Sequence, residues 1–261
     1  MGHRLQRAAG GAWRIRCVGS LVTHWRLLAL AVVIACGAPR ETVRPRVALI
    51  IDDFGYVAPA VVDSFLALDV PLTIAVLPYQ QYSRLSAERG DSAGKEVILH
   101  LPMEGRAGSN PGPDALLDSL SESEVRVRTR RALDDVPHLV GANNHMGSVF
   151  TADSQRMRWM MEEIAARRLY FRDSRTGPRS TGDAIARTLG VRTARRDVFL
   201  DNERTPEAIA RQWALVLERA RAQGSAVAIG HVYPETLAAL RELLPQSRGE
   251  VDFVLASTLA R

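Results

Sequence analysis

Short apolar runs alternate with amphipathic segments along most of the chain. The runs are three to six residues long and rich in β-branched side chains, and they are continuous rather than alternating. Such runs are typical of strands that are buried on both faces of a parallel sheet. They comprise residues 47–51, 72–77, 97–101, 139–142, 169–171, 198–200, 226–229 and 251–255.

Helical patterns lie between these runs. Residues 205–223 carry apolar positions at helical spacing, with Thr205 as the N-cap, Pro206 at the first helical position and Gly224 after the end. Residues 151–168 form another such pattern, whose methionines we assign to the core rather than to a ligand site.

Two further features punctuate the middle of the chain. Ser121 and Glu124 have the spacing of a capping box and predict a helix after them. Residues 105–119 are rich in Gly, Pro, Ser and Asn and form the main irregular stretch. Their length suits either a loop that covers a site or a plain surface insertion.

The alternation of strand and helix predicts an α/β fold. Seven or eight such units within residues 46–261 favour a single (β/α) barrel over two domains. The alternative is a doubly wound open sheet, which usually has a glycine-rich turn after its first strand. The corresponding turn here, DDFGY at residues 52–56, has no such glycines.

The charge distribution argues against a nucleic-acid partner. The chain has 34 basic and 29 acidic residues, a formal net charge of +5. Five arginines but no acidic residue precede Cys36, so the remainder carries 29 of each. A balanced folded part lacks the basic surface that nucleic-acid binding requires.

The first 36 residues have the features of an export signal. A basic segment precedes nine apolar residues, 27–35, which are too few to span a bilayer as a helix. Residues 33–36 (VIAC) resemble a lipoprotein processing site, in which Cys36 would be lipidated; an ordinary signal peptide or an uncleaved anchor is the alternative. Residues 37–45 would then be a polar tether. We expect an exported protein of the periplasm or cell envelope, with membrane contact only through this segment.

Polar side chains gather where the predicted strands end. In a parallel (β/α) fold the functional groups lie at the carboxyl ends of the strands. Three of the six histidines occur there, so we expect a functional site at this edge. The residues at these ends are Asp52, Asp53, His100, Glu104, Asn143, Asn144, His145, Asp173, Arg175, Asp201, Asn202 and His231.

These residue types suit metal-assisted hydrolysis. A divalent cation with imidazole and carboxylate ligands and an open position lowers the pKa of a bound water. The neighbouring aspartates Asp52 and Asp53 point to opposite sides unless the strand bends, so one can bind a metal and the other can accept a proton. A histidine opposite them can protonate the leaving group. The pattern therefore favours cleavage of an amide or ester.

Seven segments, in this order and at this spacing, resemble the divergent polysaccharide deacetylase family. The resemblance extends from about residue 46 to residue 259 and implies a distorted, deacetylase-like barrel of seven or eight strands. It also implies a metal-dependent carbohydrate deacetylase. The segments are IIDDFGY (50–56), LTIAVLP (72–78), EVILHLPME (96–104), GANNHMGS (141–148), FRDSRT (171–176), RDVFLDN (196–202) and AIGHVYPET (228–236).

The resemblance also suggests roles for individual residues. It implies that Asp52 is the catalytic base, that Asp53 is a metal ligand and that His231 is the catalytic acid. The third strand of such enzymes usually carries two histidines four residues apart, whereas here the pair is His100 and Glu104. We expect His145 to complete the ligand set with Asp53 and His100, and Glu104 to be a substitute ligand or a support for one.

The remaining polar residues at the strand ends are expected to orient ligands or to bind substrate. They are Asn144, Asp173, Arg175, Asp201 and Asn202. Zinc is the metal that we expect for two histidines and one aspartate, although other divalent ions also accept such ligands. The expected function is removal of acetyl groups from an acetylated glycan. The alternative, motivated by Glu104, is a barrel that binds an envelope glycan or a partner without turnover.

Overall fold

The computed structural model describes residues 43–261. The predictions for the export signal, Cys36 and most of the tether lie outside these residues. The strands are β1 (Arg46–Phe54), β2 (Thr73–Val76), β3 (Glu96–Met103), β4 (Leu139–Met146), β5 (Tyr170–Asp173), β6 (Thr193–Arg195), β7 (Val198–Phe199), β8 (Ser225–His231) and β9 (Asp252–Val254). The helices are α1 (Pro59–Leu66), α2 (Ser83–Ser92), α3 (Glu122–Asp135), α4 (Ser154–Ala166), α5 (Gly182–Thr188), α6 (Pro206–Gln223) and α7 (Pro234–Ser247), with 3₁₀ turns η1 (Phe150–Ala152) and η2 (Ala256–Leu259).

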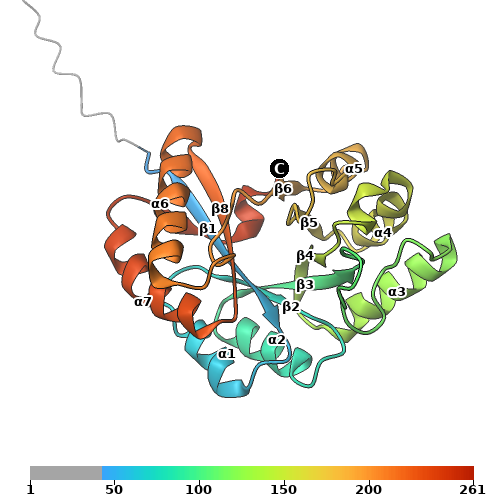
Figure 1. The fold of residues 1–261 in the computed structure, drawn as a ribbon, viewed down its shortest axis with the longest axis horizontal. Coiled ribbons are helices and arrows are strands. Elements are labelled where there is room, and N and C mark those ends of the chain that lie inside the picture. Colours follow the sequence, from blue (N-terminus) through green and yellow to red (C-terminus); the bar gives the residue numbers. More distant parts are fainter. Residues whose placement is uncertain (1–42) are drawn as a thin grey trace, which may run out of the picture. The chain divides into compact units, whose positions relative to one another are not determined.

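All strand pairs of the sheet are parallel, and the sheet curls into a distorted barrel. Its order is β6-β5-β4-β3-β2-β1-β8-β7, so β6 and β7 lie at opposite ends of the sheet. Only Arg196 and Asp197 connect these two strands, which brings the ends together. Arg196 N donates to Asp173 O on one side of this seam, and Asp197 N donates to Val227 O on the other, both at 3.0 Å. The predicted barrel is confirmed, and the open doubly wound sheet is excluded (Figure 1).

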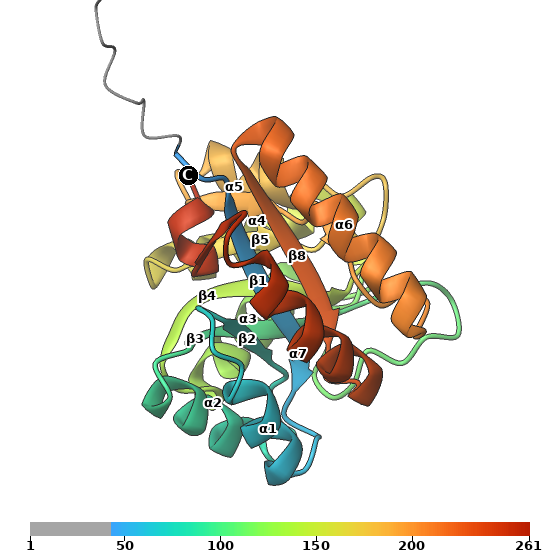
Figure 2. The ribbon, with the colours of Figure 1, turned by 90° about the vertical axis from the view of Figure 1, so that its left-hand side faces the viewer.

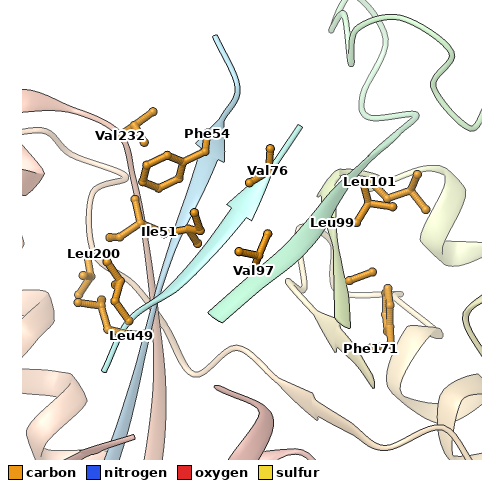
Figure 3. Close-up of a cluster of buried hydrophobic side chains, with 14 of the residues drawn as sticks. Leu49, Ile51, Phe54, Val76, Val97, Leu99, Leu101, Phe171, Leu200 and Val232 are labelled. Atoms are coloured by element: carbon orange, nitrogen blue, oxygen red, sulfur yellow. The ribbon is translucent and has the colours of Figure 1, made fainter. Parts of the chain in front are cut away.

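The helices lie around the outside of the curled sheet (Figure 1), and α6 runs alongside β8 (Figure 2). The main core lies between the sheet and the helices, and side chains that face outward from the strands contribute to it. Figure 3 shows part of this core, where Leu49 and Ile51 of β1 lie near Leu200, all completely buried. The methionines of α4 are also buried there, as predicted. No helix within residues 43–261 has the length and hydrophobicity required to cross a membrane.

Inward-facing side chains fill the barrel with a second, smaller core. Ala48 and Ile50 of β1 alternate with the outward residues and pack with Ile98 and Ile229. At the amino-terminal end of the strands, η2 extends this core, and Ala256 N donates to Thr73 Oγ1. Side chains of η2 therefore help to fill the interior at this end, and the site lies at the opposite end, where the strands have their carboxyl ends.

Local sequence signals set the helix ends. The Thr205 hydroxyl accepts from Ala208 N at the start of α6, and α6 ends at Gly224, which has a φ of 79°. Ser121 and Glu124 form both bonds of the predicted capping box. The helix predicted over 151–168 is shorter than expected, because Asp153 accepts from Gln155 N and Arg156 N and starts α4 only after η1.

Candidate active site

A pocket of about 440 Å³ opens at the carboxyl ends of the strands. Strand ends β1, β3, β4, β7 and β8 contribute to its walls, together with the start of the irregular stretch 105–119. The start of this stretch, at Gly105, Arg106 and Ser109, therefore borders the pocket. The volume of the pocket lies within the range of small-molecule binding sites.

Asp52 and Asp53 both reach this pocket although they are neighbours on one strand. Asp52 pairs in register with His231 of β8, and both side chains face the barrel interior. Regular alternation would turn Asp53 outward. Asp53 instead has a φ of 70°, and the register between β1 and β2 shifts between Ile51 and Phe54. This left-handed conformation returns the second carboxylate to the pocket.

Three ligand atoms form a nearly equilateral triangle on the pocket floor. Asp53 Oδ1 lies 3.2 Å from His100 Nε2 and 3.1 Å from His145 Nδ1. The two ring nitrogens lie 3.1 Å apart. Asp53, His100 and His145 are the group within residues 43–261 that could hold a metal ion, as the sequence predicted.

The two ring nitrogens can share a hydrogen bond, but the carboxylate oxygen of Asp53 fits a metal ion better than a hydrogen bond. Although both ring nitrogens are close, Asp53 Oδ1 is buried and has no hydrogen-bond partner among residues 43–261. With metal–ligand bonds of about 2.1 Å, donors lie about 3.4 Å apart in a tetrahedral site and about 3.0 Å apart on an octahedral face. The observed separations of 3.1–3.2 Å fall between these values.

Asn143, which sequence reasoning had given no role, links the metal ligands to the candidate base. Its Nδ2 donates to Asp52 Oδ1 at 2.8 Å, which leaves its Oδ1 to accept from His100 Nδ1 at 2.6 Å. This network assigns the proton of His100 to Nδ1 and leaves the lone pair of Nε2 directed at the triangle. The contact forms because Asn143 of β4 lies beside His100 of β3 in the register of the two parallel strands.

Electrostatics at the floor favour a bound positive charge. Burial alone would raise the pKa of Asp53, but the imidazoles of His100 and His145 hold it well below its usual range. Burial lowers the pKa of His100, yet the carboxylates of Asp52 and Asp53 outweigh this effect and raise it. Burial raises the pKa of Asp52 itself, against the charges of His100 and His231. A carboxylate with a raised pKa is the stronger proton acceptor.

His231 lies in a setting that keeps it protonated. Its Nδ1 is 2.7 Å from Asp201 Oδ1, and its backbone N–H donates to Asp201 Oδ2 at 2.7 Å. Thr236 Oγ1 donates to the same Oδ2. Burial lowers the pKa of His231, but the hydrogen bond and charge of Asp201 raise it to about 9. The contacts of Asp201 thus hold the imidazole of His231 in place, whereas the sequence led us to expect that Asp201 orients ligands or binds substrate.

Two aromatic rings hold the imidazole of His231 between them. Phe199 stacks on it at 5.7 Å and Tyr233 at 5.4 Å between centroids. Outside this sandwich, the guanidinium of Arg196 lies 3.7 Å from the Phe199 centroid and that of Arg204 lies 3.5 Å from the Tyr233 centroid. The five side chains form a ladder in which cations and π faces alternate along one wall of the pocket.

Glu104 does not take the place of the second histidine. The chain leaves β3 after Met103, so Glu104 no longer follows the strand alternation that would bring it beside His100. Its Oε2 accepts from Asp118 N at 2.6 Å, and it is absent from the ligand group. The expectation that Glu104 is a ligand or supports one is wrong, because its carboxylate holds the irregular stretch instead.

The other expected substrate contacts divide between the pocket and its surroundings. Asn144 lines the pocket, but its amide bonds to Met146 O and Ser174 N and so positions neighbouring loops. Asn202 lines the pocket and is exposed. Asp173 faces away from the pocket, since its carboxylate accepts from Arg175 N and Ser180 Oγ.

Arg175 does not contribute to the pocket lining either. It is exposed, with a φ of 48°, and its carbonyl accepts from the Arg196 guanidinium. The structure thus brings together Asp52, Asp53, His100, His145 and His231, with Asp201 behind His231. It leaves Glu104, Asp173 and Arg175 outside.

Comparisons with known proteins agree with this fold and identify the family. Residues 49–260 match the model of the family described as divergent polysaccharide deacetylase. The chain is 33% identical over 233 residues to the protein YibQ of Escherichia coli (strain K12), covering 89% of this chain and 72% of YibQ. It is 33% identical over 216 residues to a protein of Haemophilus influenzae, covering 83% and 77%. The chain belongs to the divergent polysaccharide deacetylase family.

Solved structures show the same fold. The protein ATU2773 of Agrobacterium tumefaciens C58 superposes with a TM-score of 0.79 at 24% identity, covering 84% of this chain and 91% of that one. The catalytic domain of a peptidoglycan N-acetylglucosamine deacetylase from Eubacterium rectale ATCC 33656 superposes with a TM-score of 0.51 at 14% identity, with coverages of 84% and 91%. The deacetylase-like barrel is therefore established.

Proposed function

We propose that this protein is a metal-dependent hydrolase that removes acetyl groups from an acetylated glycan. The observation that carries the proposal is the meeting of three ligand atoms, from Asp53, His100 and His145, beside Asp52 and His231 in one pocket. The family supports it, as does the likeness of the fold to a peptidoglycan N-acetylglucosamine deacetylase.

The donor set and the pocket assign a role to each group. A divalent cation held by the three donors would polarise the acyl carbonyl and acidify a water molecule. Asp52, whose pKa burial raises, accepts the proton of the attacking water. His231 donates its proton to the departing sugar nitrogen or oxygen, and Asp201 stabilises the imidazolium until then. Asn143 holds both Asp52 and His100 in place.

The metal and the cellular location are part of the same proposal. Two imidazoles and one carboxylate with further open positions suit zinc. The basic and apolar features of residues 1–36 support export to the periplasm or envelope, and Cys36 is the proposed site of lipid attachment. An acetylated envelope glycan would be accessible to an enzyme in this location.

Acetate release from acetylated glycans tests the proposal directly. The purified full chain, loaded with zinc, is incubated with N-acetylated and O-acetylated oligosaccharides, and free acetate is measured. We expect release by the wild type, and at least about 10²-fold less by Asp52→Asn, with the zinc content unchanged. Zinc-loaded protein that binds glycan but releases no acetate would favour the alternative of a binding barrel.

A further inference from the structure

Three arginines surround the proposed active site. Arg106 lines the pocket on the irregular stretch 105–119. The guanidinium carbons of Arg196 and Arg204 lie 3.7 and 3.5 Å from the ring centroids of Phe199 and Tyr233, the two pocket-lining rings that enclose His231. Stacking holds these two guanidinium groups at fixed positions rather than leaving them free in solvent.

None of the three has an acidic partner within residues 43–261. Arg106 and Arg204 form no ion pair there, and Arg196 donates to the carbonyls of Ser174 and Arg175. Asp52, Asp173 and Asp197 are near enough to influence the charge of Arg196, but no ion pair joins them. Exposed arginines elsewhere in the described part of the chain commonly pair with carboxylates. Examples are Arg44, Arg89, Arg221 and Arg248.

The acidic groups near the mouth are directed elsewhere. The Glu104 carboxylate binds Asp118 N, and the nearest ion-pair partner of Glu203 is Arg211, at 3.7 Å. Asp53 belongs to the proposed metal site, and Asp201 is paired with His231. Asp52 accepts from Asn143 deeper in the pocket. The three guanidinium groups at this mouth therefore have no carboxylate partner within residues 43–261. Guanidinium groups without such a partner can bind an anionic group of a ligand.

A neutral acetyl group gives no reason for this arrangement. We propose that the acylated substrate of this site carries an anionic group, a carboxylate or a phosphate, which Arg106 and Arg204 recognise. A guanidinium that is stacked through its face keeps its N–H edge available for a bidentate contact with such a group. This inference rests on the proposed glycan hydrolase, and it assigns the substrate class of the same site.

Binding measurements test the charge preference independently of turnover. Three tetrasaccharides that share an N-acetylated backbone are titrated into the full chain by calorimetry: neutral N-acetylchitotetraose, a 6-phosphorylated derivative, and a form in which alternate residues carry a lactyl carboxylate. We expect at least one anionic form to bind about tenfold more tightly than the neutral form at low salt. The difference should shrink as the salt concentration rises.

Variants show whether the arginines are responsible. Arg106→Gln and Arg204→Gln should each lose most of the anionic preference, measured as the ratio of anionic to neutral affinity within the same variant. Arg204→Lys should keep part of it, which shows that loss in the glutamine variant is not a folding defect. Arg241→Gln is the matched control, since Arg241 is an exposed arginine of α7 without an ion-pair partner in residues 43–261 and away from this pocket.

The outcome for charge is separable from the outcome for hydrolysis. Equal binding of neutral and anionic tetrasaccharides, or a preference that persists in both glutamine variants, would overturn the inference even if acetate is released. An arginine-dependent preference without acetate release would support the anionic ligand and count against the hydrolase. The phosphorylated and carboxylated forms distinguish the two sources of the anionic group.

Discussion

Asn143 is not one of the proposed metal ligands, but its amide positions one of them, His100, together with the candidate base Asp52. This amide accepts from His100 Nδ1 and donates to Asp52 Oδ1. We predict that Asn143→Ala weakens zinc binding by about 10–100-fold, because His100 loses the partner that sets its tautomer and ring orientation. Competition titration against a zinc chelator measures this change.

The neighbouring amide provides the control for that experiment. Asn144 bonds to Met146 O and Ser174 N rather than to a ligand, so Asn144→Ala should leave the zinc affinity within about threefold of the wild-type value. Wild-type affinity in Asn143→Ala, or an equal loss in both variants, would contradict the proposed role.

The protonation state of His231 should set the alkaline limit of activity. Its pKa is raised to about 9 by Asp201, so the proton donor is present below that pH and lost above it. We predict that kcat/KM for acetate release falls as pH rises through about 9. In Asp201→Asn the attraction of the carboxylate is gone, and the limb should move down towards the ordinary histidine value of about 6.5. If the alkaline fall of kcat/KM in Asp201→Asn stays at the wild-type pH, a group other than His231 titrates there.

Strand alternation explains which site residues the sequence could identify. Asp52, His100, His145 and His231 follow from their positions at strand ends and from even spacing along inward-facing positions. The carboxylate of Asp53 reaches the pocket only because its backbone is left-handed, and no residue pattern predicts that conformation. The same alternation could have excluded Asp173, because Arg172 next to it is in register with inward-facing Asn143.

At the scale of elements, the stretch that follows β3 depends on Glu104 for its position. The Glu104 carboxylate accepts from Asp118 N and ties the two ends of the stretch together. We predict that Glu104→Ala keeps a full equivalent of zinc and lowers the free energy of unfolding by about 1 kcal/mol. Elemental analysis and urea denaturation measure the two effects. Loss of zinc in this variant would restore Glu104 as a ligand.

The contact between β4 and β5 requires a glycine at position 141. A Cβ at Gly141 would lie 2.5 Å from Tyr170 Cε1, and Tyr170 cannot easily move because its hydroxyl bonds to Glu96. We predict that Gly141→Ala lowers the free energy of unfolding by about 1–3 kcal/mol. Gly249→Ala is the control, since its Cβ would meet no atom of residues 43–261 within 4 Å. Urea denaturation of both compares them, and equal stability would contradict this packing.

Some elements leave no pattern in the sequence. The strand β6, Thr193–Arg195, is three residues long, lies at one end of the sheet and has no apolar run. Backbone contacts hold it: Thr193 N donates to Arg261 O, and Arg261 N donates back to Thr193 O. The starts of helices α3 and α6, in contrast, could be predicted from their N-cap residues, Ser121 and Thr205.

At the scale of the whole molecule, a repeated βα pattern was sufficient to predict the barrel but not its closure. The seam between β6 and β7 depends on Arg196 and Asp197, whose backbone N–H groups bond to β5 and β8. Neither residue differs in type from ordinary loop residues, so long-range pairing decides where the barrel closes. The pocket exists because this closure brings β7 and β8 opposite β3 and β4.

Elemental analysis of the purified full chain, with His100→Ala and His145→Ala beside it, tests the central claim most directly. We predict one equivalent of zinc in the wild type after dialysis against zinc, and its loss in both variants, because each removes one corner of the triangle formed with Asp53. Arg241→Gln, far from the ligands, should retain the metal. A wild-type protein that takes up no metal, or variants that keep a full equivalent, would contradict the metal site and the mechanism built on it.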